Sequence, residues 1–281
     1  MLSSRSNYAV MGKLEGKVAF ISGAARGQGR AHAVRLAEEG ADIIAIDVCA
    51  QYPTVVYKMS EPEDLNETVR QVESLGRRIV AHQVDVVDFP VLQKAFDDGA
   101  AELGGVDIVV ANAGIGPGGQ STDDEQWDDV VNVNMKGVWN TVRVAVPTML
   151  TQDRGGSIIL TSSTGGLIGT PVISGGMLGY TAAKHGVIGI MRTYANYLAP
   201  HYIRVNSVAP TTVATPMANN GDLSMLKKYE PAMARALENA IPVDYVEARD
   251  VANAVAWLAS DDARYVTGTV VPVDAGLLNK V

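Results

Sequence analysis

The sequence has little of several residue types that define other classes of protein. Cys49 is the only cysteine among 281 residues, which excludes an internal disulfide and a cysteine-based metal cluster. The four histidines share no spacing that suits a metal ion, so we expect no metal site. The formal net charge is -8 and no basic run occurs, and we therefore expect no nucleic-acid partner.

Long apolar runs are missing as well. No stretch approaches the roughly 20 apolar residues of a membrane-spanning helix, so no membrane partner is expected. Residues 1–12 lack the apolar core of a secretory signal and are expected to form a flexible N-terminal extension. A cytoplasmic location follows as the default expectation.

The rest of the chain alternates between strand and helix patterns. Hydrophobic residues make up 47% and charged residues 19%, an ordinary globular balance. The expected strands are residues 18–22, 41–46, 78–84, 106–111, 157–160, 204–208 and 270–273, and the expected helices are residues 30–39, 62–75, 89–103, 125–148, 180–198 and 250–259. This alternation predicts an α/β fold, with a single Rossmann-type doubly wound parallel sheet and helices on both faces, in one domain over residues 13–281.

Three segments interrupt this rhythm. They are residues 48–61 after the second strand, residues 165–179, which are rich in glycine, and residues 216–242, which contain several methionines. Long irregular segments in a compact domain are usually functional or disordered, so all three are candidate lids.

A glycine-rich turn joins the first strand to the first helix. Gly23, Gly27 and Gly29 would allow a tight turn and close approach of a diphosphate, whose charge lies at the helix N-terminus. Asp47 ends the second strand, where a carboxylate accepts hydrogen bonds from the adenosine ribose and repels a 2′-phosphate. Arg26 in the turn favours a phosphate instead, and Asp47 could also be a simple turn residue. No basic residue follows Asp47 directly, and NAD is the expected cofactor.

A tyrosine and a lysine lie four residues apart in a predicted helix. Tyr180 and Lys184 therefore share one helix face, near its expected start. A free phenol has a pKa near ~10, and a nearby ammonium, helped by an oxidised nicotinamide, would lower that pKa. Ser163, at the end of a strand, could hydrogen-bond the oxygen of a substrate. A Tyr-x-x-x-Lys pair alone is weak evidence, since most such pairs are helix surface.

Taken together, these motifs resemble the short-chain dehydrogenase/reductase family. The matching residues, in family order, are Gly23, Gly27 and Gly29, then Asn112, Ala113 and Gly114, then Asn134, Ser162 and Ser163, and finally Tyr180 and Lys184. The resemblance covers about residues 13–281. It implies that Ser163 holds the substrate oxygen, with Ser162 as a one-residue alternative, and that Tyr180 exchanges its proton. Lys184 would bind the nicotinamide ribose and lower the tyrosine pKa, and Asn134 would hold a water on the proton relay.

The same resemblance implies the remaining cofactor contacts. They are Gly23, Arg26, Gly27, Gln28 and Gly29 in the turn, Asp47 at the ribose, Asp85 and Val86 at the adenine, Asn112, Ala113 and Gly114 along the nucleotide, and Pro210, Val213 and Thr215 at the nicotinamide. Thr211 departs from the glycine that the family commonly has there.

A narrower resemblance concerns the mycofactocin-associated branch, which includes carveol-dehydrogenase-like enzymes. It is carried by residues 22–30, by the insertion that begins at Asp47, and by residues 182–186. It implies that the insertion covers an NAD that stays bound and passes electrons to a mycofactocin-type acceptor. The family also implies a homotetramer assembled through the helix at 180–198 and the C-terminal region.

The expected activity is hydride transfer between a small hydrophobic secondary alcohol, such as a terpenoid or cyclic alcohol, and its ketone. An apolar substrate is suggested by six side chains before the tyrosine helix, namely Leu167, Ile168, Val172, Ile173, Met177 and Leu178. Two alternatives stay open. One is an NADPH-dependent 3-ketoacyl-thioester reductase of the same fold, and the other is a catalytically silent nucleotide-binding protein.

Overall fold

The computed structural model describes residues 12–116, 118, 121–219 and 231–280. The strands are β1 (Val18–Ser22), β2 (Asp42–Asp47), β3 (Ile79–Gln83), β4 (Ile108–Ala111), β5 (Gly156–Thr161), β6 (Ile203–Pro210) and β7 (Val270–Val273). The longer helices are α1 (Gly27–Glu38), α2 (Pro62–Ser74), α3 (Phe89–Leu103), α4 (Asp123–Val131), α5 (Val138–Gln152), α6 (Gly175–Leu198) and α10 (Ala248–Ala259). Shorter pieces are η1 (Asn132–Gly137), η2 (Thr164–Gly166), η3 (Ala199–His201), α7 (Pro216–Asn219), α9 (Pro231–Ala236), η4 (Asp261–Ala263) and η5 (Leu277–Asn279).

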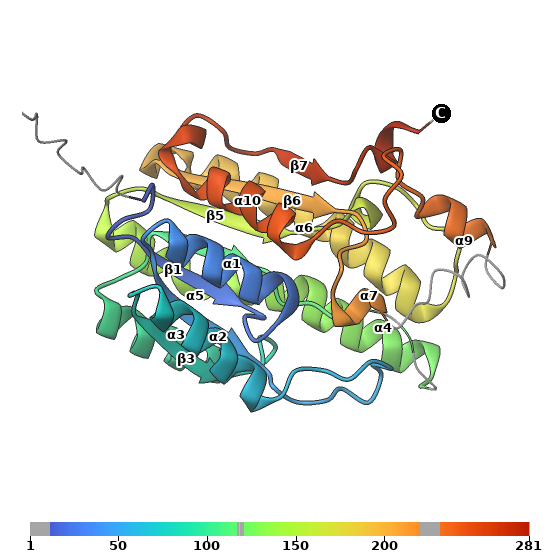
Figure 1. Cartoon of the computed structure of the whole chain (residues 1–281), viewed down its shortest axis with the longest axis horizontal. Helices are drawn as coiled ribbons and strands as arrows, with labels where there is room; N and C mark the ends of the chain where they lie inside the picture. The colour runs from blue at the N-terminus through green and yellow to red at the C-terminus, as the bar shows by residue number, and fades with distance from the viewer. Residues whose placement is uncertain (1–11, 117, 119–120, 220–230, 281) are drawn as a thin grey trace, which may run out of the picture.

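All described strands pair in parallel in one sheet, in the order β3-β2-β1-β4-β5-β6-β7. The order reverses between β1 and β4, which confirms the doubly wound fold expected from the sequence. Helices cover both faces of the sheet (Figure 1). In an arrangement of this kind ligands bind where the order reverses, at the carboxyl ends of the strands.

The core forms two layers because neighbouring residues of a strand point to opposite faces. In β1, Val18 and Phe20 pack in the layer that contains α3, α5 and α6, while Ala19 and Ile21 pack in the layer that contains α1 and α10. All four side chains are buried, as expected for a strand covered on both faces.

Three expected elements differ from the structure. The helix expected at 125–148 is interrupted by a π-helical turn, η1, between α4 and α5. The helix expected from Tyr180 begins at Gly175, so Tyr180 lies in its second turn and the last five residues of the segment 165–179 are helical. The segment 216–242 contains α7 and α9, and its Met225 lies outside the described residues. The expected extension at residues 1–12 falls almost entirely outside the described part of the chain.

No helix among the described residues is both long enough and apolar enough to cross a membrane.

Candidate active site

A cavity of about 670 Å³ lies at the carboxyl ends of the central strands. It is lined by all sixteen residues expected at the cofactor site and by Ser163, so that Asn134 is the one expected site residue that does not line it. The site residues predicted from the sequence therefore come together in space, although they are spread over positions 23 to 215 of the chain. Asn134 is fully buried directly behind the cavity wall.

The glycine-rich turn closes one side of this cavity. Gly23 has a φ of +70° and its absent Cβ would lie 2.8 Å from Cα of Ala113, so this position needs glycine for both reasons. A Cβ at Gly29 would lie 1.9 Å from the carbonyl oxygen of Gly23. The N-terminus of α1 is thus packed tightly against the turn, and its first residues, Gly27, Gln28 and Gly29, line the cavity, where a helix N-terminus favours an anion.

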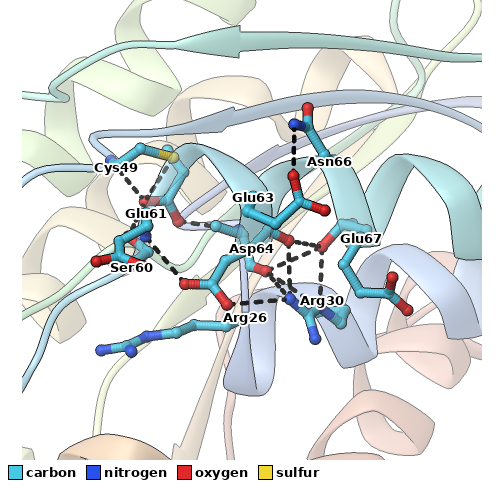
Figure 2. A network of polar contacts seen from close by, with 12 residues as sticks. Arg26, Arg30, Cys49, Ser60, Glu61, Glu63, Asp64, Asn66 and Glu67 are labelled. Carbon is cyan, nitrogen blue, oxygen red and sulfur yellow. Dashed lines mark hydrogen bonds and ion pairs between the residues drawn. The ribbon is translucent and has the colours of Figure 1, made fainter.

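Asp47 is a buried carboxylate at the end of β2 that accepts hydrogen bonds from three residues. Its Oδ2 accepts from the Ala25 N–H at 2.9 Å, and its Oδ1 accepts from the Cys49 N–H at 3.1 Å and from the Ser60 hydroxyl at 2.6 Å. Figure 2 shows Cys49 and Ser60 close together at this point. The carboxylate is therefore oriented before any ligand arrives, which is more than a simple turn residue requires.

Residues 48–61, which we call the strap, run along the cavity between β2 and α2 (Figure 1). The strap is attached to three separate parts of the fold. The Thr54 hydroxyl donates to Asp129 of α4 at 2.7 Å, the Tyr52 hydroxyl donates to Asp85, and Arg26 of the glycine turn donates to the Lys58 carbonyl. Arg26, expected at a phosphate, is thus also a link between the glycine turn and the strap.

The strap also contributes several side chains to the cavity that the sequence did not identify one by one. They are Tyr52, Val56, Tyr57, Met59 and Ser60. The sequence marked the whole segment as a cover for the cofactor, because of its length and position. Which side chains point inward depends on hydrogen bonds to distant residues, and these leave no local signal.

Ser163, Tyr180 and Lys184, which we call the tyrosine cluster, form the opposite side of the cavity. Ser163 follows β5 and shares a hydrogen bond with the Tyr180 hydroxyl, while Lys184 Nζ lies 5.7 Å from the centre of the tyrosine ring. Lys184 Nζ donates to the Thr161 carbonyl at 2.9 Å. The two side chains that are four apart on α6 therefore lie on one face of the helix, with Tyr180 directed to Ser163 and Lys184 to Thr161, as the spacing predicts.

The two candidate serines are distinguished by their partners. Ser162 is buried and donates its hydroxyl to the Lys184 carbonyl at 2.9 Å, which fixes it to α6. Ser163 accepts from the Gly165 N–H at 3.1 Å and faces Tyr180. The geometry thus favours Ser163 as the serine that faces a ligand.

Burial dominates the electrostatics of the tyrosine cluster. It raises the pKa of Tyr180, and the hydrogen bond from Ser163 opposes this shift. It also lowers the pKa of Lys184 to about 8. Without a bound cofactor the pKa of Tyr180 is therefore raised, because desolvation of the phenol dominates and Lys184 Nζ donates to the Thr161 carbonyl.

Asn134 lies in the π-helical turn η1, and its side chain bonds to both backbone polar groups of Ile115. Its Oδ1 accepts from the Ile115 N–H at 2.7 Å, and its Nδ2 donates to the Ile115 carbonyl at 2.8 Å. The turn that places Asn134 there could not be read from the sequence, since a π-helical turn has no local propensity signal.

The C-terminal wall of the cavity is lined by Pro210, Val213 and Thr215, as expected. Thr211, where the family commonly has glycine, donates its hydroxyl to Asn239 at 2.9 Å and is buried.

Of the six apolar residues expected near a substrate, Ile168, Val172 and Met177 line the cavity. Leu167, Ile173 and Leu178 are partly or largely exposed and do not. Met217, Leu237 and Tyr245 also line this end, and no local pattern marked the last two.

The fold and this cavity define a nucleotide-binding α/β protein with a tyrosine, a lysine and a serine at one end of the site. Comparisons with known proteins agree with this class. The family model described as enoyl-(acyl carrier protein) reductase matches residues 23–278. A putative short-chain type dehydrogenase/reductase of Mycolicibacterium smegmatis is 53% identical over 281 residues, covering 96% of this chain and 99% of that protein.

Two further matches carry more specific descriptions. The (-)-trans-carveol dehydrogenase of Rhodococcus erythropolis is 46% identical over 277 residues, covering 95% of this chain and 99% of that protein. The crystal structure of carveol dehydrogenase from Mycobacterium avium in complex with NAD is 50% identical, with a TM-score of 0.88, covering 96% of this chain and 100% of that one. The chain belongs to the short-chain dehydrogenase/reductase family of oxidoreductases.

Proposed function

We propose that the protein is an NAD-dependent dehydrogenase that interconverts a small hydrophobic secondary alcohol, carveol-like in its chemistry, and the corresponding ketone. The observation that carries this proposal is the single cavity that has Asp47 on one side and the tyrosine cluster on the other. Similarity to proteins described as carveol dehydrogenases, one of them in complex with NAD, supports the same reading.

The residues present fit NAD. An anion site at the N-terminus of α1 suits the diphosphate, and the preoriented carboxylate of Asp47 suits the hydroxyls of the adenosine ribose. A 2′-phosphate at that carboxylate would bring two negative charges together in a buried place, which disfavours NADP. Asp85 and Val86 would flank the adenine, and Lys184 would bind the nicotinamide ribose.

Bound NAD would supply the hydride acceptor for alcohol oxidation, and NADH the donor for ketone reduction. The Ser163 hydroxyl would hold the substrate oxygen, and the Tyr180 phenolate would take the hydroxyl proton as the alcohol becomes the ketone. Burial alone keeps the Tyr180 pKa high, so the charge that favours phenolate would have to include the positive nicotinamide. Because the Asn134 side chain is committed to Ile115, a relay water would bind its main-chain carbonyl.

The strap supports a further part of the proposal. Its attachments to α4, to Asp85 and to the glycine turn would have to break before a dinucleotide beneath it could leave. We therefore propose that NAD stays bound between turnovers and that a mycofactocin-type acceptor reoxidises it. A cytoplasmic homotetramer, assembled through α6 and the C-terminal region, belongs to the same proposal.

The rival with a specific observation in its favour is a reductase of carrier-bound thioesters, because the matching family model carries that description. Such an enzyme would prefer NADPH, which the buried carboxylate of Asp47 opposes. The catalytically silent alternative has no supporting observation, since Ser163, Tyr180 and Lys184 converge in the cavity.

The test follows NADH absorbance with a panel of terpenoid and cyclic alcohols, for the wild type and for Tyr180→Phe. We expect the substitution to lower the rate by about a thousandfold, within the range for a lost proton-transfer group. Activity that survives Tyr180→Phe would refute the mechanism. Rapid turnover of many equivalents of free NAD would refute cofactor retention, and a preference for NADPH with thioesters would favour the rival.

A further inference from the structure

Tyr57 is a strap residue that reaches across the cavity to the segment after β4. Its side chain is buried, and its hydroxyl accepts a hydrogen bond from the Gly116 N–H at 3.0 Å. Gly116 lies in a crowded place, because a Cβ there would be 3.1 Å from Met217 of α7 and 3.6 Å from the Tyr57 ring. Three segments far apart in the sequence therefore meet at this point and close the cavity.

Tyr57 and Asn134 form hydrogen bonds to the same backbone segment, at residues 115 and 116. The Ile115 N–H and carbonyl both bond to the Asn134 side chain, and the Gly116 N–H, in the same peptide unit as that carbonyl, donates to Tyr57. One residue earlier, a Cβ at Gly114 would lie 3.2 Å from Asn134 Oδ1 and 3.7 Å from Lys184 Nζ. The backbone from 114 to 116 is thus a part of the cavity wall close to Lys184, and it is fixed from behind by Asn134 and from the strap side by Tyr57.

We propose that Tyr57 is a positioning residue for hydride transfer, which anchors the 114–116 wall and so sets the space between the tyrosine cluster and the nicotinamide. This inference rests on the proposed function, since it assumes NAD and an alcohol in the cavity. It assigns to one strap residue a task distinct from retention of the cofactor.

The physical basis is geometric. Removing the hydroxyl leaves the Gly116 N–H without its buried partner, which favours local movement of the wall. Hydride transfer depends steeply on the distance and alignment of donor and acceptor, so a small displacement slows the chemical step. The affinity for NAD should change little, because the other strap attachments, at Thr54, Tyr52 and Lys58, are untouched.

The experiment compares Tyr57→Phe with a matched control, Thr54→Val. Each substitution removes one strap hydroxyl and keeps the side-chain volume, but Thr54 bonds to Asp129 on α4 and does not line the cavity. Purified protein carrying NAD is mixed with one alcohol, and a single reduction of the bound cofactor is followed. We expect Tyr57→Phe to slow this step about tenfold and to raise the primary deuterium isotope effect, with NAD content equal to that of the wild type. Thr54→Val should stay within about twofold of the wild type.

A second measurement is independent of turnover. Amide hydrogen exchange, measured on NAD-loaded protein, should become faster in the peptide that contains Gly116 in Tyr57→Phe, and should not in Thr54→Val. Equal single-turnover rates for Tyr57→Phe and the wild type, or equal slowing by both variants, would overturn the inference. If no alcohol reduces the wild type's cofactor, the proposed function fails. Amide hydrogen exchange then tests by itself whether Tyr57 anchors the 114–116 wall, and unchanged exchange at Gly116 overturns that role.

Discussion

The two long sides of the cavity are built in different ways. The tyrosine cluster lies on regular elements, with Ser163 at the end of β5 and Tyr180 and Lys184 on α6. The strap that faces it contains no helix or strand and is shaped by side chains that bond to backbone groups. The first side takes its geometry from periodic secondary structure, and the second takes it from individual hydrogen bonds. Substitutions in the tyrosine cluster should therefore impair the chemical step, whereas substitutions in the strap, apart from Tyr57, should change cofactor exchange.

After Tyr180→Phe, the largest effect is expected from Ser163→Ala, which also lies in the tyrosine cluster. Loss of a hydroxyl that holds the substrate oxygen should lower kcat by about a hundredfold to a thousandfold, with NAD content unchanged. Ser162→Ala is the matched control, because its hydroxyl bonds to the Lys184 carbonyl instead. It should lower stability by about 1–3 kcal/mol and kcat by less than tenfold. Steady-state kinetics and denaturant unfolding of both variants check this, and a larger kcat loss in Ser162→Ala would reverse the assignment.

The difference between the two sides also explains what could be predicted from the sequence. The strands were predictable because buried parallel strands are short apolar runs, and β1 and β7 have the expected bounds. The family motifs then placed the tyrosine cluster. The start of α6 was missed because Gly175 has poor helix propensity. Its absent Cβ would lie 2.2 Å from the Asp123 carbonyl oxygen, and Ser174 caps the helix, so packing decides against propensity there.

The strap was predictable only as a segment. Its length marked it as a cover, but the bonds of Tyr57 to Gly116 and of Thr54 to Asp129 join residues 59 and 75 positions apart. No local pattern encodes such pairings. The π-helical turn at Asn134 was missed for a related reason, because Gly137 lies too close to Val86 for a Cβ, at 2.5 Å, and this contact exists only in the folded chain.

Lys184 should make the stability of the tyrosine side depend on pH. Its pKa falls from 10.5 to about 8 on folding because it is buried. Below about pH 8 the lysine is charged in both states, and the full desolvation cost destabilises the native state. Between about pH 8 and pH 10.5 only the unfolded state keeps the proton, so the wild type gains stability as the pH rises.

Lys184→Met removes this titration. We expect the stability advantage of the methionine variant over the wild type to shrink by up to about 3 kcal/mol between about pH 7 and about pH 10, since each pKa unit is worth about 1.4 kcal/mol. Denaturant unfolding at the two pH values measures the change. Lys136→Met, at an exposed position, should show no such change. A stability difference that is the same at both pH values would show that Lys184 keeps its proton on folding.

Asp47 directly precedes the strap, and Asp47→Asn tests how strongly its carboxylate favours NAD over NADP. The substitution removes the negative charge that Ala25, Cys49 and Ser60 surround. We expect the ratio of NAD to NADP affinity to fall by about 10-fold to 50-fold, because repulsion of a 2′-phosphate disappears. Calorimetric binding of both cofactors to protein stripped of nucleotide measures this. Asp42→Asn, at the other end of β2, should lower stability through its pairs with Arg77 and Arg78 and leave the ratio unchanged.

The smallest effect is expected in the strap itself, and it comes from Gln51→Glu. The Gln51 side-chain amide donates to the carbonyls of Tyr52, Val55 and Tyr57 at 3.1, 2.8 and 3.3 Å, and its Oε1 accepts from the Met59 N–H at 3.0 Å. A carboxylate keeps the acceptor but turns an oxygen toward three carbonyl oxygens, which should cost about 1 kcal/mol in the closed strap.

Because of this cost, bound NAD should exchange with labelled NAD about fivefold faster than in the wild type. The rate of a single reduction of the bound cofactor should stay unchanged. Gln93→Glu on α3 makes the same change of charge at a half-buried position away from the strap, and should leave exchange unaltered. If Gln51→Glu slowed the single reduction and left exchange alone, the influence on the chemical step proposed for Tyr57 would extend to the rest of the strap. The contrast between the two sides of the cavity would then be wrong.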